Sequence, residues 1–292
     1  MNRFRAAAVL SLAFGLARPA ASAGPQDVVA VLSSSAGPYQ SALDGFIGAF
    51  GRAVPSIRLP ARPTIGPRTR VVVALGGEAA VQSYPEDATL IVCLAPGRAA
   101  RLPHRGPVVF LSMRPEPRQL VSELRRLQPA LKRLAVLSNP RDAERYFGDL
   151  GRAGSEIGIE VVPAFASGPE AVPDALRAVL ASKADALWLA PDPVLVTPET
   201  FQTIKQFSID NKMPFYAPTR DLAVAGASAA LSAGAEETGR QAAALARRAL
   251  AGETLPEVVY SLGAKLTVNL PAARKSGLSI PAGLGKNVEV LR

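Results

Sequence analysis

Small and hydroxyl-bearing residues stand at two places where a predicted strand gives way to a helix. Ser33 and Ser34 follow one apolar strand pattern, and Gly76 and Gly77 follow another. Backbone N–H groups at the start of a helix, together with nearby hydroxyls, are well suited to hold a carboxylate or another small anion. These two turns are therefore candidate anion-binding positions. The alternative is a plain loop and a tight turn, since the third glycine of a dinucleotide fingerprint is absent.

Two acidic and two aromatic residues are candidates for binding the rest of a small ligand. An ammonium group is well held by a carboxylate, and Asp192 and Glu78 both follow predicted strands. A flat apolar ligand would stack on an aromatic ring, for which Tyr39 and Tyr216 are the candidates. Structural alternatives remain open: Asp192 lies between two prolines and could be only a turn or cap residue, and Tyr39 could only cover the apolar face of the first helix.

The usual patterns of an enzyme are missing from the sequence. There is no G-x-S-x-G nucleophile elbow, no H-E-x-x-H motif and no P-loop. The single histidine, His104, lies in a loop of arginine, proline and glycine, which is more typical of a surface position than of a general base. The single cysteine, Cys93, lies in an apolar strand pattern and is typical of a small core residue. We therefore predict a protein without catalytic activity, metal or other cofactor; an exported hydrolase built around His104 is the weakest alternative.

The first 23 residues are predicted to be a secretory signal peptide. Arg3 and Arg5 precede a short apolar segment over residues 6–17, and Ala21-Ser22-Ala23 supplies the small residues of a cleavage site. The apolar segment is shorter than the roughly 20 residues that a membrane-spanning helix needs. Although the formal net charge is +9, export and the lack of a basic stripe interleaved with aromatic residues argue against a nucleic-acid partner.

The rest of the chain alternates between apolar strands and helices. Strands are expected at residues 27–32, 70–75, 89–94, 108–111, 133–137, 160–165, 186–189, 215–217, 229–231, 258–262 and 265–270, with a short one at Ile57. Helices are expected at residues 39–52, 115–128, 142–157, 170–180, 197–211 and 236–251, with short ones ending at Tyr84 and Lys275. Such alternation implies right-handed crossovers and mostly parallel sheets. We predict an α/β protein of two Rossmann-like lobes joined by a hinge. The N-terminal lobe is expected over residues 24–130 and the C-terminal lobe over 131–292, with late segments crossing the hinge.

The stretch from Arg133 to Pro140 marks the predicted start of the second lobe. It is a continuous apolar run that stops at a Ser-Asn-Pro turn, which is the pattern of a strand covered on both faces. The loop at the carboxyl end of such a strand faces the ligand crevice in a doubly wound sheet. Asn139, in this loop, is therefore a candidate binding residue, although its side chain could serve only its own turn.

Several short segments carry a resemblance to a known family. They are Gly76–Ala80, Leu137–Pro140, Pro191-Asp192, Met213–Ala217, Gly226-Ala227, Gly239–Ala243, Leu250–Gly252, Lys265–Leu270, Ala272–Arg274 and Gly277–Pro281. In their order and spacing they resemble a family of ABC-transporter substrate-binding proteins whose better-understood members bind tryptophan and other aromatic amino acids. The resemblance covers nearly the whole chain after the signal peptide and is closest after Arg133.

This resemblance implies the type I periplasmic-binding-protein fold and a role in recognition. A small molecule, such as an amino acid or small organic acid, would be captured between the lobes and delivered to an ABC permease in the inner membrane. The protein would be periplasmic, and we expect a monomer. Pro191-Asp192 resembles the family's Thr-Asp ligand loop and the Asn139 turn resembles its Tyr-Asn-Pro turn, so the resemblance favours a binding role for Asn139 and Asp192.

The chain also departs from the family pattern. Ser112-Met113-Arg114-Pro115 stands where the family has Asp-Pro, the Thr-Gly-Val-Ser segment that follows is missing, and Glu144-Arg145 replaces an Asn-Ser pair. The first lobe is therefore predicted to be shortened, with an altered pocket to which Ser112 would contribute. These departures motivate an alternative function, in which the protein has lost transport and serves as a sensor or accessory binding subunit with a degenerate pocket.

Overall fold

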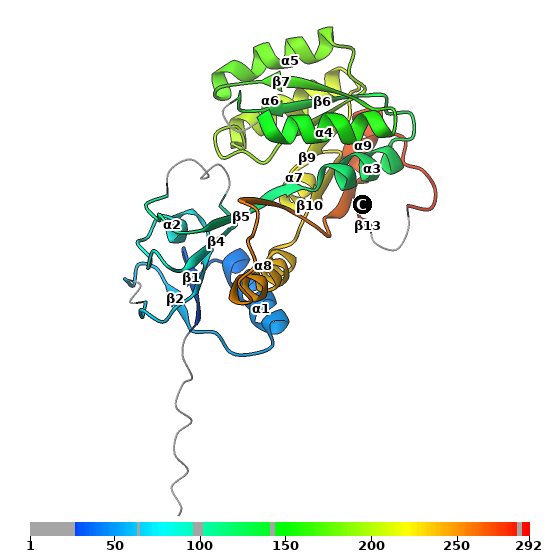
Figure 1. Cartoon of the computed structure of the whole chain (residues 1–292). Coiled ribbons are helices and arrows are strands. Elements are labelled where there is room, and N and C mark those ends of the chain that lie inside the picture. Colours follow the sequence, from blue (N-terminus) through cyan, green and yellow to red (C-terminus); the bar gives the residue numbers. More distant parts are fainter. Residues whose placement is uncertain (1–26, 63–64, 96–101, 141–143, 285–287) are drawn as a thin grey trace, which may run out of the picture.

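The computed structural model describes residues 27–62, 65–95, 102–140, 144–284 and 288–292, so the signal peptide predicted over residues 1–23 lies outside the described chain. Two α/β lobes are present, each built on its own sheet (Figure 1). In spatial order, the first sheet has β11 (Val258–Ser261), β5 (Val108–Pro115), β4 (Thr89–Cys93), β3 (Val71–Leu75), β1 (Val28–Leu32) and β2 (Ser56–Arg58). The second has β13 (Val288–Leu291), β12 (Lys265–Asn269), β10 (Ala229–Ser232), β9 (Phe215–Ala217), β8 (Ala186–Leu189), β6 (Arg133–Ser138) and β7 (Glu160–Phe165).

Helices cover the faces of both sheets, as mostly parallel strands require. They are α1 (Gly37–Phe50), α2 (Gly77–Ala80), α3 (Pro117–Leu127), α4 (Glu144–Glu156), α5 (Val172–Ala181), α6 (Pro198–Asp210), α7 (Arg220–Val224), α8 (Ala235–Leu250) and α9 (Leu270–Lys275), with a 3-10 turn at Pro169–Ala171. Every described strand pair is parallel except β10 with β12, which is antiparallel. The α/β class and the two mostly parallel sheets confirm the prediction from the sequence.

The apolar strands are buried on both faces. Along β1, Val28, Ala30 and Leu32 pack into the core beneath α1 and α8, whereas Val29 and Val31 pack into the core on the other face. This alternation follows from the two-residue period of a strand. The second sheet likewise has an apolar core on each face, which explains why its strands appear in the sequence as continuous hydrophobic runs.

Helix α6 begins where its sequence predicts. Thr197 is extended, its hydroxyl accepts a hydrogen bond from the backbone N–H of Thr200 at 3.1 Å, and Pro198 occupies the first helical position. The cap satisfies a backbone donor that has no partner within the helix, and proline removes one such donor and fixes φ near the helical value. Thr197 and Pro198 therefore determine where the loop that follows β8 ends and α6 begins.

The boundary between the lobes differs from the predicted one at residue 130. Helix α3 packs into the core of the second lobe through Leu120, Leu124 and neighbouring apolar residues. Helix α8, late in the chain, packs into the core of the first lobe through Ala242 and Ala246. The first lobe therefore consists of residues 27–115 together with 235–261. The chain crosses between the lobes three times: after β5, between β10 and α8, and after β11 (Figure 1).

The only cysteine and the only histidine of the sequence are both buried in the first lobe. Cys93 is buried as predicted, and burial raises the pKa of its thiol to about 12, so the thiol is protonated and unreactive near neutral pH. The expectation of a surface position for His104 is wrong. Its side chain is buried, with Nε2 3.0 Å from the backbone oxygen of Ala88. His104 therefore ties its loop to the segment before β4.

Two elements were not predicted because they are too short to show a period. Helix α7 has five residues and β13 has four. They are joined by a salt bridge in which Arg220 Nε lies 2.8 Å from Glu289 Oε2, and the Thr267 hydroxyl donates to the same oxygen at 3.1 Å. These contacts fasten the C-terminal strand to the edge of the second sheet.

We predict that the Glu289→Gln substitution lowers the melting temperature at pH 7 and that this difference from wild type shrinks as the pH falls through the lowered pKa of Glu289 in the folded protein. The hydrogen bond from Arg220, with that from Thr267, lowers the pKa of Glu289 in the folded protein. A lowered folded-state pKa adds stability above the unfolded-state pKa, and that stability is lost as the pH falls through the folded value. Both side chains are largely exposed, so we expect a small effect.

Thermal melts of both proteins between about pH 3 and pH 7 would measure this difference. Glu257→Gln, which removes an exposed carboxylate of the first lobe, is the control for the loss of one negative charge. Equal pH profiles for the two variants would contradict a specific role of the Arg220–Glu289 pair.

Candidate ligand-binding site

In the first lobe, three of the predicted site residues converge at the carboxyl ends of β1 and β3. The Ser33 N–H donates to the Leu75 oxygen at 2.9 Å, which brings the two turns together. Gly76 has φ of 104°, and a Cβ placed on it would lie 2.3 Å from Ser33 Oγ and 2.8 Å from Tyr39 Cε1. Only glycine fits this position, because it tolerates the positive φ and leaves room for both neighbours. The half-buried Tyr39 ring and the Ser33 hydroxyl thus form one surface with the Gly76 backbone.

The serine hydroxyls at this edge have local partners and still keep a donor. Ser33 Oγ accepts from the Ala79 N–H at 2.9 Å, and Ser34 Oγ accepts from the Ala36 N–H at 3.2 Å. A hydroxyl that accepts one hydrogen bond retains its own O–H to donate. Helix α1 starts beside them with no side-chain cap and no acidic residue in its first turn, which leaves its positive end suited to an anion.

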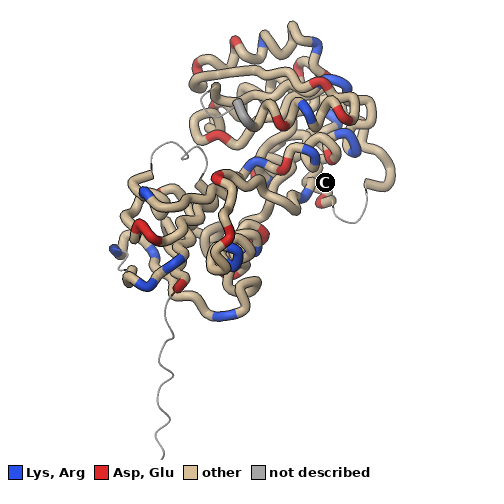
Figure 2. The backbone as a smooth tube through the Cα atoms, viewed as in Figure 1, with Lys and Arg blue, Asp and Glu red and all other residues tan. Residues whose placement is uncertain are grey.

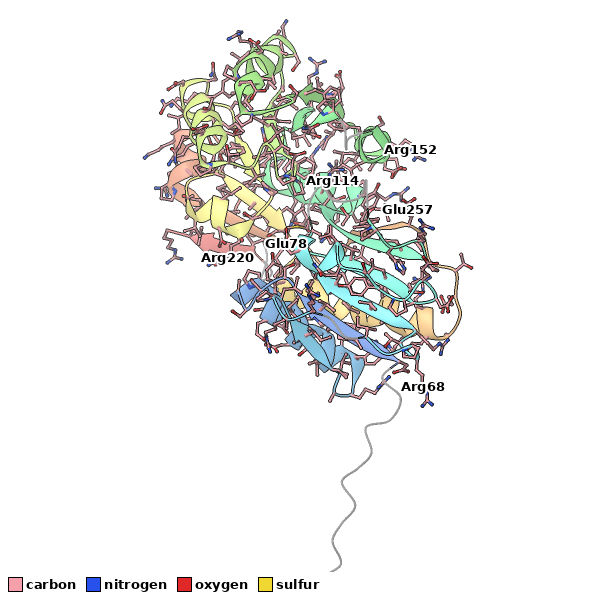
Figure 3. All side chains as sticks on the ribbon, turned by 90° about the vertical axis from the view of Figure 1, so that its left-hand side faces the viewer. Arg68, Glu78, Arg114, Arg152, Arg220 and Glu257 are labelled. Carbon is pink, nitrogen blue, oxygen red and sulfur yellow. The ribbon has the colours of Figure 1, made fainter. Side chains whose placement is uncertain are left out.

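The other predicted residues of the first lobe are more dispersed. Gly77 begins α2, and the exposed Glu78 follows it, at the end of this lobe that faces the second one (Figure 3). Ser112 lies on β5, which β4 separates from β3. Its hydroxyl accepts from the Arg114 N–H at 3.0 Å, and its backbone lies opposite Tyr260 on β11. Ser112 therefore belongs to the crossing between the lobes rather than to the surface formed by Ser33 and Gly76.

In the second lobe, Asn139 and Asp192 follow the neighbouring strands β6 and β8. These strands pair in parallel, and the Ala190 N–H donates to the Leu137 oxygen at 3.0 Å, so the two loops leave the sheet side by side. Asn139 is 6% exposed, and its Nδ2 lies 3.4 Å from the Ser167 oxygen. Adjacent loops at the carboxyl edge of a parallel sheet are the usual place for a ligand site.

The two carboxylate oxygens of Asp192 have different surroundings. The residue is 2% exposed, and Oδ1 accepts from the backbone N–H groups of Val194 at 2.8 Å and Leu195 at 3.0 Å. Oδ2 is also buried, and within the described part of the chain it has no hydrogen-bond partner. A buried carboxylate oxygen without a donor is unfavourable, so this atom is suited to receive a donor from a ligand. Oδ1 thus fills the turn role that was the alternative, and Oδ2 has no donor among the described residues.

Tyr216 does not belong to the site. Its side chain is 0% exposed in the core of the second lobe, and its hydroxyl donates to Gln128 Oε1 at 2.6 Å. Burial raises the pKa of this hydroxyl far above its ordinary value. The short strand β9 directs the ring of Tyr216 between the sheet and its covering helices, so no face of the ring is available for stacking.

The structure places two further residues at the carboxyl edges that the sequence analysis did not select. Arg58 ends β2, beside Leu32 of β1, and its NH2 donates to Gln40 Oε1 on α1 at 2.7 Å. Phe165 ends β7 and is 47% exposed, with its ring edge-on to Phe147 at a centroid distance of 5.4 Å. Phe165 was detectable, because it is the last residue of the strand predicted at residues 160–165, whereas Arg58 lies in a segment rich in proline and arginine that was predicted to be mostly irregular.

The described residues contain neither a cluster of metal ligands nor a membrane-spanning helix. No group of three or more histidine, cysteine, aspartate or glutamate side chains in that part of the chain is placed to hold a metal ion. None of its helices is long and apolar enough to cross a bilayer. Figure 2 shows lysine and arginine interspersed with aspartate and glutamate over both lobes, in keeping with the scattered charges of the sequence.

Comparison with protein families identifies the chain. The profile of the family described as ABC transporter substrate binding protein matches residues 115–289, which is more than half of the chain. The chain belongs to this family. The match spans the second lobe and the late segments of the first, whereas residues 27–114 lie outside it. The family is one of substrate-binding proteins rather than enzymes. No curated protein sequence matches the chain.

Solved structures share the fold at low sequence identity. The chain is similar to CD0873, a substrate-binding protein with adhesive properties from Clostridium difficile, in its ligand-free, open form, with 17% identity, a TM-score of 0.61 and coverage of 91% of this chain and 98% of the other. It is similar to an ABC domain from Streptococcus pneumoniae in complex with L-Trp, with 17% identity, a TM-score of 0.59 and coverage of 91% and 100%. A conserved domain protein from Vibrio cholerae has 18% identity, a TM-score of 0.59 and coverage of 91% and 99%. The fold is therefore the type I periplasmic-binding-protein fold that the resemblance implied.

Proposed function

We propose that this chain is an exported solute-binding protein that captures a small molecule between its lobes and delivers it to an ABC permease. The observation that carries the proposal is the buried Oδ2 of Asp192, which has no hydrogen-bond partner among the described residues and lies at the carboxyl edge of a sheet in a member of a substrate-binding family. The protein would act in the periplasm as a monomer, released from the predicted signal peptide.

The two lobes offer complementary chemistry for a zwitterionic or acidic ligand. The first lobe has the hydroxyls of Ser33 and Ser34 and the uncapped start of α1, which suit a carboxylate. The second has the carboxylate of Asp192, which suits an ammonium. Tyr39 supplies the aromatic surface on which a flat ligand body would stack. A molecule that contacts both lobes binds the closed arrangement more tightly than the open one. This difference in affinity shifts the hinge equilibrium toward closure.

We expect a ligand of this class to raise the melting temperature of residues 24–292. A ligand present at about 100 times its Kd stabilises the folded state by about 2.7 kcal/mol, or roughly 5–10 °C for lobes of this size. The measurement is a thermal-shift screen against amino acids, small organic acids and purine-like compounds. A shift that grows with ligand concentration supports the proposal, and the absence of any shift across the three classes would contradict it.

The alternative of a sensor or accessory binding protein is favoured by one observation. The family profile begins at residue 115, so the first lobe up to that point departs from the family pattern. Transport requires a permease, whereas a sensor or accessory protein with a degenerate pocket does not. Genes for a permease and an ATPase beside this one would support transport, whereas a neighbouring sensor kinase or outer-membrane receptor would support the alternative.

A further inference from the structure

Two of the three crossings between the lobes are bonded to one another. The Glu116 N–H donates to the Ser261 oxygen at 3.0 Å, and the Ser261 hydroxyl donates to the Arg114 oxygen at 3.1 Å. The ends of β5 and β11 are therefore held together. A change in the angle between the lobes must be accommodated at or near these residues and at the third crossing, between β10 and α8.

Helix α4 of the second lobe lies against both of these bonded crossings. The Tyr146 hydroxyl donates to the Pro115 oxygen at 2.9 Å, and the Tyr260 hydroxyl donates to Asp149 Oδ2 at 2.9 Å. The two tyrosine rings pack edge to face with centroids 5.3 Å apart, and the Arg114 guanidinium lies 5.4 Å from the Tyr146 ring centroid. Figure 3 shows Arg114 at the junction of the lobes. One face of α4 thus contacts residues of both crossing strands.

The same helix is connected to the candidate ligand loops. It follows the loop that contains Asn139, and the Tyr146 ring packs on Trp188 at a centroid distance of 5.9 Å. Trp188 is fully buried in β8, four residues before Asp192. A shift of the Asn139 or Asp192 loop is therefore transmitted to Tyr146 through close-packed groups, because protein interiors have little free volume to absorb it.

We propose that Tyr260 and Asp149 are positioning residues whose hydrogen bond couples the ligand loops of the second lobe to the angle between the lobes. This inference deepens the proposed function, on which it rests for its biological meaning. Tyr260 belongs to the sheet of the first lobe and Asp149 to a helix of the second, so their bond can persist only while α4 keeps its place on the crossings.

The surroundings of this bond allow it to be made and broken. Tyr260 and Asp149 line an open hollow of about 240 Å³ together with Glu116, Arg118 and Arg152. Asp149 also forms an ion pair with Arg152. Water from the hollow can therefore replace the Tyr260 hydroxyl when the lobes turn, and the carboxylate remains partnered. Such a contact favours one lobe arrangement without locking it.

The test is the distance between the lobes in the protein without any ligand. Spin labels on Ser83→Cys in the first lobe and Gln202→Cys in α6 report this distance, since both residues are exposed. Cys93 is buried and escapes labelling. We expect Tyr260→Phe to change the ratio of lobe arrangements about tenfold, which is the size expected for losing one hydrogen bond to a charged group. In an Asp149→Ala background, Tyr260→Phe is expected to change nothing further.

Tyr84→Phe is the matched control, because it removes a buried tyrosine hydroxyl that donates to the Ala79 oxygen within the first lobe. We expect it to lower the melting temperature and leave the distance distribution as in wild type. An unchanged distribution in Tyr260→Phe, or an equal change in Tyr84→Phe, would overturn the inference. Since no ligand is added, this outcome is independent of the thermal-shift screen, and either proposal can fail alone.

Discussion

Gly45→Ala is expected to destabilise the protein by about 2–4 kcal/mol, although the same substitution three residues later is expected to stabilise it. Helices α1 and α8 approach closely at Gly45: a Cβ placed there would lie 2.1 Å from the backbone oxygen of Glu236. The obstacle is backbone, so it cannot rotate away, and one of the two helices must move. At Gly48 a Cβ would meet nothing within 4 Å.

Gly48→Ala is therefore the matched control for Gly45→Ala. In an exposed helix interior, alanine is favoured over glycine by about 0.5–1 kcal/mol, because glycine loses more backbone freedom on folding. Urea denaturation of the two variants measures both changes in the free energy of unfolding, the expected loss for Gly45→Ala and the expected gain for Gly48→Ala. The comparison holds when the dependence of that free energy on urea concentration is the same as in wild type. If Gly45→Ala were as stable as wild type, the close approach of α1 and α8 would be refuted.

Gly239 makes the same contact from the other side. A Cβ on this residue would lie 1.9 Å from the backbone oxygen of Ala42 in α1. Because Gly45 and Gly239 serve one helix–helix contact, the effects of replacing both by alanine should not add: once the helices have separated for the first Cβ, the second is accommodated at less cost. Small residues thus allow the late helix α8 to lie close to α1 in the first lobe.

This contact also shows why the sequence predicted the bounds of a helix or strand better than the elements against which it packs. The helix over residues 236–251 was predicted nearly as it is found, since its boundaries are local. Its place in the first lobe was not predicted, because that depends on a contact between residues almost two hundred positions apart. The same limit applies to β12, whose antiparallel pairing with β10 no local pattern reveals.

The candidate site was predictable to the extent that it follows from strand ends. The apolar run from Arg133 led directly to Asn139, and two strand-to-helix turns led to Ser33 and Gly76, which the structure brings together. The prediction that Tyr216 binds the ligand was wrong because the residue was selected for its aromatic type. Its strand has three residues, which is too short to show which face is buried. Arg58 was missed because its strand lies in an irregular segment rich in proline and arginine.

Asp192→Asn is expected to weaken ligand binding about a hundredfold while leaving the ligand-free protein as stable as wild type or more so. Asparagine keeps the acceptor oxygen that Val194 and Leu195 use, so the turn is retained. The substitution removes the charge from the buried Oδ2. Without a donor from any described residue, this ionised oxygen is unfavourable in the empty protein. With a ligand bound, the same change replaces an acceptor by a donor that faces the ligand's own donor, which accounts for a loss of about 3 kcal/mol.

The measurement is the melting temperature of wild type and variant with and without the ligand identified by the screen. Asp185→Asn is the matched control, because Asp185 Oδ2 accepts from the backbone N–H groups of Lys132 and Arg133 at 2.7 Å, at the opposite end of β6 from the Asn139 loop. Asp185→Asn makes these charge-assisted hydrogen bonds neutral and weaker, and no buried charge without a donor offsets the loss as it does at Asp192. We therefore expect Asp185→Asn to lower the melting temperature and to keep the ligand-induced shift, which is the reverse of the pattern for Asp192→Asn. A full ligand-induced shift in Asp192→Asn would remove Asp192 from the site. It would also direct the search for the ligand's partner to the carboxyl edge of the first lobe, where Ser33, Tyr39 and Gly76 meet.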